Sequence, residues 1–242
     1  MSMKVIVCES YEDMSRRAAK IFAETIVEKP TCVLGFATGS TPLGMYNEFI
    51  RMHKEEGLDF SRATSFNLDE YYPISPDNDQ SYRYFMEKNL FEHINIPASA
   101  THVPNGSAID AEAECAAYDK MIEDFGGIDI QVLGIGVNGH IAFNEPDDAL
   151  VAATHVTTLT DSTVEANSRF FASENDVPKQ AITMGMGTIL KARAIVCLIT
   201  GKDKNDVVKQ LLTDKIDPMC PATFLKLHSN VTILCDEDAY NG

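Results

Sequence analysis

The segment Gly134–Pro146 carries three side chains that could exchange protons with a small molecule. His140 stands five residues before Glu145, and a nearby carboxylate can fix the tautomer of an imidazole and raise its basicity. Asn138 adds an amide, which can orient either group but cannot act as a base. The sequence therefore indicates an acid–base site built on Asn138, His140 and Glu145.

Two other interpretations of this segment are weaker. Its first residues match the pattern G-x-G-x-x-G of dinucleotide-binding sites, which requires a helix to begin within the pattern. Pro146 follows soon afterwards and no helical repeat is present, so we expect a loop. A zinc site would need a third ligand, which the pair His140 and Glu145 does not supply. We therefore expect neither a dinucleotide nor a metal at this segment.

Two adjacent carboxylates, Asp69 and Glu70, follow another predicted strand. Neighbouring side chains there point in different directions, so we expect one carboxylate to face a pocket. A solvated acidic turn is the alternative. At its reference pKa of about 3.9, Asp69 would be ionised and ready to act as a base.

The segment Thr38-Gly39-Ser40-Thr41-Pro42 offers hydroxyls and exposed N–H groups for an anion, and Gly39 would let the backbone approach it. No Gly-Lys-Ser/Thr follows, so this is not the nucleotide P-loop. Thr41 suits a helix N-cap and Pro42 the first helical position, so an ordinary capped turn is the alternative. Arg169 and Lys204 are candidate cations for the same anion, although either could be surface charge.

The elements that must position these residues alternate along the chain. We predict strands at Lys4–Cys8, Cys32–Phe36, Thr64–Leu68, Ile128–Ile135, His155–Leu159, Ala194–Ile199 and Val231–Cys235. Amphipathic patterns predict helices at Tyr11–Glu28, Pro42–Lys54, Ser81–His93, Ala111–Asp124, Ser162–Ala172 and Asn205–Thr213. This alternation predicts one α/β domain over residues 1–242, a doubly wound, mainly parallel sheet with helices on both faces. Ligands of such Rossmann-like folds bind beyond the carboxyl ends of the strands, which is where the candidate residues fall.

Composition narrows the classes of partner. The 242 residues carry a formal net charge of −16, which disfavours nucleic acids and anionic membranes. No apolar stretch is long enough to span a membrane, and no signal peptide is evident. The six cysteines form no C-x-x-C pair, so we expect reduced, buried thiols and a cytoplasmic protein.

The order of these motifs resembles the glucosamine-6-phosphate deaminase (isomerase) family, in its short form. The resemblance runs from about Lys4 to Asp236, and the most specific part is the stretch Gly-His-Ile-Ala-Phe-Asn-Glu-Pro at Gly139–Pro146. It implies conversion of glucosamine 6-phosphate to fructose 6-phosphate and ammonia without a cofactor. The substrate would be a small amino-sugar phosphate.

The resemblance also implies roles for individual residues. Asp69 falls where the enolisation base sits, His140 matches the ring-opening acid–base and Glu145 its carboxylate partner. The positions that would hold the 6-phosphate are Thr38, Gly39, Ser40, Thr41, Arg169 and Lys204.

The chain departs from larger family members at three places. Some of those members carry Asp where this chain has Asn138, so we expect the amide to orient His140 or the substrate. The stretch Ala153–Thr158 lacks the basic side chains that bind an amino-sugar phosphate activator in regulated hexamers, and the chain ends soon after its last predicted strand. We therefore expect an unregulated monomer or small homo-oligomer. Separately, we expect a lid around residues 143–172.

Three alternatives stay open. A 6-phosphogluconolactonase-like hydrolase has a similar Gly-His loop, but Glu145 together with Asp69 favours the deaminase. A galactosamine-6-phosphate deaminase would differ only in the orientation of one substrate hydroxyl. A non-catalytic sugar-phosphate sensor would tend to lose the catalytic carboxylates, which this chain keeps.

Overall fold

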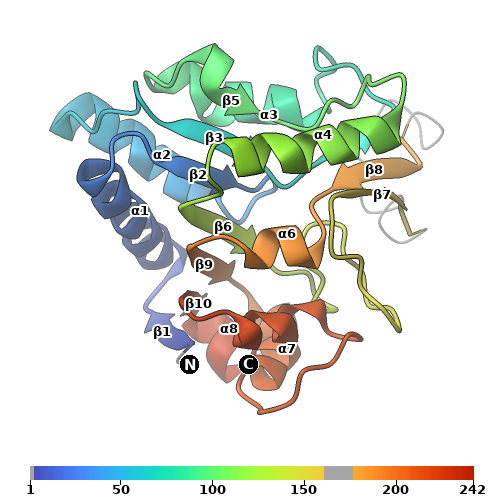
Figure 1. Cartoon of the computed structure of the whole chain (residues 1–242). Coiled ribbons are helices and arrows are strands. Elements are labelled where there is room, and N and C mark those ends of the chain that lie inside the picture. Colours follow the sequence, from blue (N-terminus) through green and yellow to red (C-terminus); the bar gives the residue numbers. More distant parts are fainter. Residues whose placement is uncertain (1–2, 161–176) are drawn as a thin grey trace.

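A parallel sheet of seven strands forms the centre of the molecule (Figure 1), which is a computed structural model describing residues 3–160 and 177–242. All neighbouring strands in it run parallel. Their order across the sheet is β1 (Lys4–Cys8), β10 (Val231–Asp236), β9 (Ala194–Ile199), β6 (Ile130–Gly134), β2 (Val33–Phe36), β3 (Thr64–Asn67) and β5 (Thr101–His102). The predicted doubly wound α/β class is confirmed.

Aromatic side chains show how helices cover both faces of this sheet. Phe66 on β3 is level with Gly35 on β2, so Phe66 and Phe36 project from opposite faces. The Phe36 ring is stacked against Phe22 of α1 (Tyr11–Glu28) and lies tilted beside Phe49 of α2 (Leu43–Arg51). Phe66 instead meets the ring of Tyr118, on α4 (Ala111–Asp124). The predicted three-layer arrangement therefore holds for these elements.

The remaining helices lie between or beyond the strands. They are α3 (Tyr82–Asn89), α6 (Met186–Leu190), α7 (Asn205–Leu211), α8 (Glu237–Asn241), the π-helix η1 (Met52–Glu56), and the 3-10 helices η2 (Phe91–His93), η3 (Ala98–Ala100), η5 (Lys202–Lys204) and η6 (Pro221–Leu227). Five of the six predicted helices occur at the expected places, and Ser162–Ala172 lies outside the described residues, as does the part of the predicted lid from residue 161 onward. The predicted start of α2 is wrong: Pro42 occupies the cap position, and no side chain caps the helix.

A second, antiparallel sheet of three strands was not expected from the sequence. Its order is β4 (Asp69–Tyr72), β8 (Gln180–Thr183) and β7 (His155–Thr158). The predicted strand at His155–Leu159 therefore exists, but it belongs to this small sheet. β4 was missed because its polar sequence, Asp-Glu-Tyr-Tyr, has none of the apolar runs that marked the other strands.

The strand order creates one crevice at the centre of the large sheet. From β2 the chain proceeds to β3 and β5 on one side, and it later returns to β6, β9 and β10 on the other. The loops that leave the carboxyl ends of β2 and β6 therefore diverge, and such a topological switch point is where ligands of this class bind.

All six cysteines are free and buried, as the sequence predicts. Among the described residues, no helix is long and apolar enough to cross a membrane.

Candidate active site

A cavity of about 760 Å³ opens at this switch point. Nine of the ten candidate site residues line it, contributed by the loops after β2, β6 and β9 and by the start of β4. They are Thr38, Gly39, Ser40, Thr41, Asp69, Asn138, His140, Glu145 and Lys204. The tenth, Arg169, lies outside the described residues. Within the described ranges, no three His, Cys, Asp or Glu side chains stand close enough to hold a metal.

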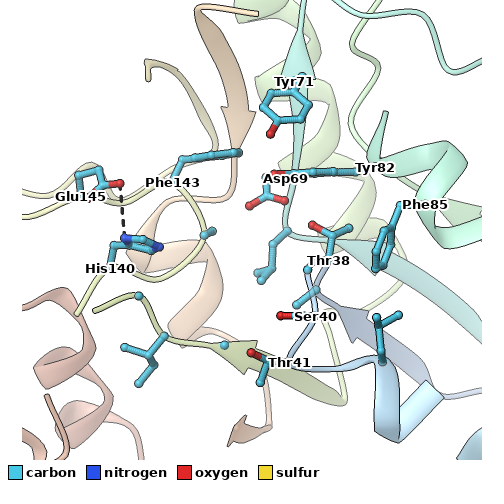
Figure 2. Close-up of a pocket in the computed structure, with 18 of the residues that line it drawn as sticks. Thr38, Ser40, Thr41, Asp69, Tyr71, Tyr82, Phe85, His140, Phe143 and Glu145 are labelled. Atoms are coloured by element: carbon cyan, nitrogen blue, oxygen red, sulfur yellow. Dashed lines mark ion pairs between the residues drawn. The ribbon is translucent and has the colours of Figure 1, made fainter. Parts of the chain in front are cut away.

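The floor of the cavity offers hydrogen-bond donors to an anion. The hydroxyls of Thr38, Ser40 and Thr41 lie along one side of the cavity in Figure 2. In the described part of the chain, no acceptor takes the backbone N–H groups of these residues or of Gly39, whose φ of 93° places it in the left-handed region. The Tyr11 side chain stabilises the loop, because its hydroxyl lies within hydrogen-bond distance of two carbonyl oxygens. These belong to Ser40 at 3.0 Å and Thr41 at 3.1 Å.

Lys204 supplies a positive charge to the same cavity. Its side chain is largely buried, and desolvation lowers the pKa of the ammonium group, while Asp203, with an oxygen 3.9 Å from Nζ, acts in the opposite direction. A partly desolvated cation interacts more strongly with an anion than an exposed one does. Among the described residues that line the cavity, Lys204 is the only lysine or arginine, so it is the candidate cation for an anionic ligand.

Asn138, His140 and Glu145 form one connected group. An oxygen of Glu145 lies 3.4 Å from Nδ1 of His140, the ion pair drawn in Figure 2, although the two are not aligned as a hydrogen bond. The side chain of Asn138 donates from Nδ2 to Glu145 at 2.7 Å and accepts from the backbone N–H of His140 at 3.1 Å. Asn138 therefore fixes both partners in place, which fits the orienting role expected of an amide.

The glycines of this loop have structural reasons to be glycines. A Cβ on Gly136 would lie 2.2 Å from the His140 ring, so the imidazole occupies the space that a side chain would need. Gly139 adopts a φ of 84°, and a Cβ there would meet the sulfur of Cys220 at 2.4 Å. As predicted, no helix begins within the G-x-G-x-x-G pattern.

Asp69 lines the cavity from another side than His140 (Figure 2). It is 7% exposed, and none of the described residues donates a side-chain hydrogen bond to its carboxylate. Burial, with a smaller contribution from the charge of Glu70, raises the pKa of Asp69 to about 8. The expectation of an ordinary, fully ionised aspartate is therefore wrong: Asp69 is a stronger base, and its protonated form predominates at neutral pH.

Four aromatic residues that sequence reasoning missed complete the wall around Asp69. Tyr71 follows Asp69 by two residues on β4 and so lies on the same side of the strand, a signal that period-2 alternation could have revealed. Tyr82 and Phe85 come from α3, and Phe143 comes from the His140 loop. The rings of Tyr82 and Phe143 are parallel, 6.2 Å between centroids, and nothing local in the sequence predicts this meeting.

The fold and the cavity together define a doubly wound α/β protein with an acid–base and anion site at the carboxyl edge of its parallel sheet. The family of glucosamine-6-phosphate isomerases and 6-phosphogluconolactonases matches residues 9–234. The chain therefore belongs to this family.

Curated relatives resemble the chain over almost its whole length. A glucosamine-6-phosphate deaminase of Clostridium perfringens is 56% identical over 98% of both chains. One from Thermoanaerobacter pseudethanolicus is 54% identical, over 98% of this chain and 94% of its own.

Solved structures give the same picture. A monomeric glucosamine-6-phosphate deaminase, 48% identical, superposes with a TM-score of 0.95 over 99% of both chains. A 6-phosphogluconolactonase from Thermotoga maritima has a TM-score of 0.74 at 22% identity, over 97% of this chain and 99% of its own, and so shares the fold.

Proposed function

We infer that this chain is an enzyme that converts glucosamine 6-phosphate and water into fructose 6-phosphate and ammonia. The observation that carries this inference is the meeting of Asp69, the His140–Glu145 pair and an anion site in one cavity. Relatives that share half or more of its residues over nearly the full chain are glucosamine-6-phosphate deaminases, and this supports the same reaction. Family membership implies that no organic or redox cofactor takes part.

The phosphate group would act as the handle of the substrate. The hydroxyls and free N–H groups of Thr38–Thr41 and the ammonium of Lys204 are the donors that an anion requires. Holding the phosphate there orients the sugar carbons between Asp69 and His140, and this removes much of the entropic cost of the later steps.

His140 would open the sugar ring. Opening requires a proton to leave the C1 hydroxyl and another to reach the ring oxygen, and an imidazole can carry out both transfers near neutral pH. Glu145 stabilises the imidazolium that forms transiently, and Asn138 keeps the two side chains together. Asn138 itself transfers no proton.

Asp69 would then move a proton between the sugar carbons. In the open aldehyde the C2–H bond is acidic, so the carboxylate removes this proton to give an enolamine and returns it to C1. Water adds to the resulting C2 imine, and ammonia leaves to give fructose 6-phosphate. The raised pKa of Asp69 suits this step because a stronger base is needed to remove a proton from carbon.

An assay of the purified protein tests this function. Ammonia and fructose 6-phosphate should appear in equal amounts from glucosamine 6-phosphate, without added metal or cofactor. Galactosamine 6-phosphate and 6-phosphogluconolactone are tested in parallel. Faster turnover of either one would show that it, and not glucosamine 6-phosphate, is the preferred substrate. The absence of turnover with all three would favour a sensor.

A matched pair of variants connects the activity to the site. Asp69→Asn removes the proposed base and should lower kcat on the order of 10²-fold or more. Asp124→Asn changes an exposed carboxylate on α4 that pairs with Lys120, so kcat should stay at the wild-type value.

The physiological setting is a further part of the proposal. Free cysteines fit a reducing compartment, and we propose that the enzyme works in the cytoplasm. There it would take part in the degradation of N-acetylglucosamine, after deacetylation of the sugar phosphate, with release of the nitrogen by hydrolysis.

A further inference from the structure

The second carboxylate of the Asp69–Glu70 pair takes no part in the proton transfers described above, yet it is the more deeply buried. Glu70 is 1% exposed, compared with 7% for Asp69. Successive side chains on β4 point to opposite sides. Asp69 therefore lines the cavity, whereas Glu70 points toward the start of α3.

Three backbone N–H groups converge on the Glu70 carboxylate. Oε1 accepts from Tyr71 at 2.9 Å and from Tyr82 at 2.8 Å, and Oε2 accepts from Arg83 at 2.9 Å. Tyr82 and Arg83 are the first two residues of α3, whose N–H groups have no partner inside the helix. A carboxylate at this end of a helix also interacts favourably with its dipole. Glu70 thus fastens α3 to β4.

The two elements that Glu70 joins form adjoining walls of the cavity. β4 carries Asp69 and Tyr71, and α3 carries Tyr82 and Phe85. The rings of Tyr71 and Tyr82 lie 4.8 Å apart between centroids, so the walls are in contact beside the proposed base. A shift of α3 would therefore change the surroundings of Asp69 directly.

We propose that Glu70 is a positioning residue for Asp69: its carboxylate fixes α3 against β4 and places a second carboxylate directly beside the proposed base. This inference rests on the proposed deaminase function, in which Asp69 is the base. It gives the buried carboxylate of Glu70, which takes no part in the proton transfers, a role in positioning the base.

Among the described residues, the other titratable groups that face Asp69 are neutral near the pH at which it titrates. They are the phenols of Tyr71 on its own strand, Tyr82 on α3 and Tyr118 on α4, each with its pKa raised mainly by burial. Burial raises the pKa of Glu70 to about 7 against the opposing effect of its three hydrogen bonds, so Glu70 is mostly ionised at pH 8. His140, Glu145 and Lys204 line other parts of the cavity.

The pH dependence of kcat/KM in Glu70→Gln tests the effect of charge. Removing the like charge should move the acidic limb of the profile to lower pH by about one unit, and kcat on the plateau should fall several-fold because the base is weaker. The ionisation of the substrate is the same for both proteins, so the difference reports on the enzyme. An acidic limb that stays at the wild-type pH would overturn the charge effect.

Glu87→Gln is the matched control. Glu87 also lies on α3, but its carboxylate pairs with the side chain of Arg83 and does not line the cavity. Its loss removes the same charge from the protein, and the limb should not move. A shift equal to that of Glu70→Gln would mean that net charge alone is responsible.

Glu70→Asp separates position from charge, and it also tests the proposal should Glu70→Gln fail to fold. The shorter side chain keeps the charge but withdraws from the N–H groups of Tyr82 and Arg83. We expect an unmoved acidic limb with kcat reduced about tenfold. Unchanged kcat and KM would refute the positioning role. If wild type releases no ammonia at all, the proposed function fails; an active wild type with an unmoved limb in Glu70→Gln contradicts this inference alone.

Discussion

At the scale of single residues, the site contains a group that the folded chain holds at a cost. Asp69 is buried without a side-chain hydrogen bond from any described residue, and its pKa rises to about 8. In the unfolded chain the same carboxyl would titrate near 4. Ionisation therefore opposes folding, and the property that makes Asp69 a useful base also lowers the stability of the protein.

The stability of Asp69→Asn should reveal this cost. The folded state binds the Asp69 proton more tightly than the unfolded state does, so the carboxyl destabilises the wild type increasingly as pH rises from about 4 to about 8. The variant should be more stable than wild type by several kcal/mol at pH 8.5, because each unit of pKa shift is worth about 1.4 kcal/mol, and little different at pH 4.5. Urea unfolding at both pH values measures the difference. Asp124→Asn should show no such pH dependence.

Gly136→Ala should separate the placement of His140 from the stability of the fold. The new Cβ would lie 2.2 Å from the imidazole, which must leave its present position. A displacement of about 1 Å in a catalytic group can cost about 10²-fold in rate, so we expect a loss of that order in kcat. Asp124→Asn, an exposed change on α4 outside the cavity, is the control. Equal activity of the two variants would contradict the placement.

At the scale of elements, the last strand and helix hold the loop that bears Lys204. Asp236, at the end of β10, accepts hydrogen bonds from the Thr200 hydroxyl and from the Gly201 N–H. The same carboxylate caps α8 through Ala239 N at 2.8 Å. The position of the Lys204 loop therefore depends on a connection between β9, β10 and α8.

Asp236→Asn should weaken that connection. The amide keeps one acceptor oxygen but turns an NH₂ group toward N–H or O–H donors, and one buried donor is left without a partner. We expect KM for the sugar phosphate to rise several-fold while kcat changes less than about twofold, because the loop holds the phosphate and not the reacting carbons. Steady-state kinetics measure both. Asp238→Asn, an exposed change on the same helix, should leave KM unchanged; an equal rise in KM there would contradict the role of Asp236.

At the scale of the whole molecule, the chain should act as an independent unit. β7, His155–Thr158, carries no Lys or Arg that could hold a second sugar phosphate. We propose a monomer whose saturation curve is hyperbolic.

Light scattering and kinetics test this proposal together. Light scattering should give one species of about 26.7 kDa at assay concentrations. N-acetylglucosamine 6-phosphate, added at increasing concentration, should leave the half-saturation point for substrate unchanged or raise it by simple competition. A larger mass with a left-shifted curve would contradict both parts.

The sequence by itself predicted the parallel sheet and nine residues that line the cavity. Strands such as Ala194–Ile199 have continuous apolar runs because both faces are buried, and this pattern is local. The site residues follow strand ends, where the chain geometry of a doubly wound sheet exposes them. The strands and the residues that follow them could be predicted because both depend on the local pattern of residue types.

Tertiary structure decided what depends on distant contacts. β4 is polar, so only its pairing with β8 makes it a strand. The aromatic wall joins Tyr82 and Phe143, which are far apart in the chain and follow no shared local pattern. The basicity of Asp69 likewise comes from the burial that its neighbours impose, because the free energy of a charge depends on its surroundings and not on its residue type.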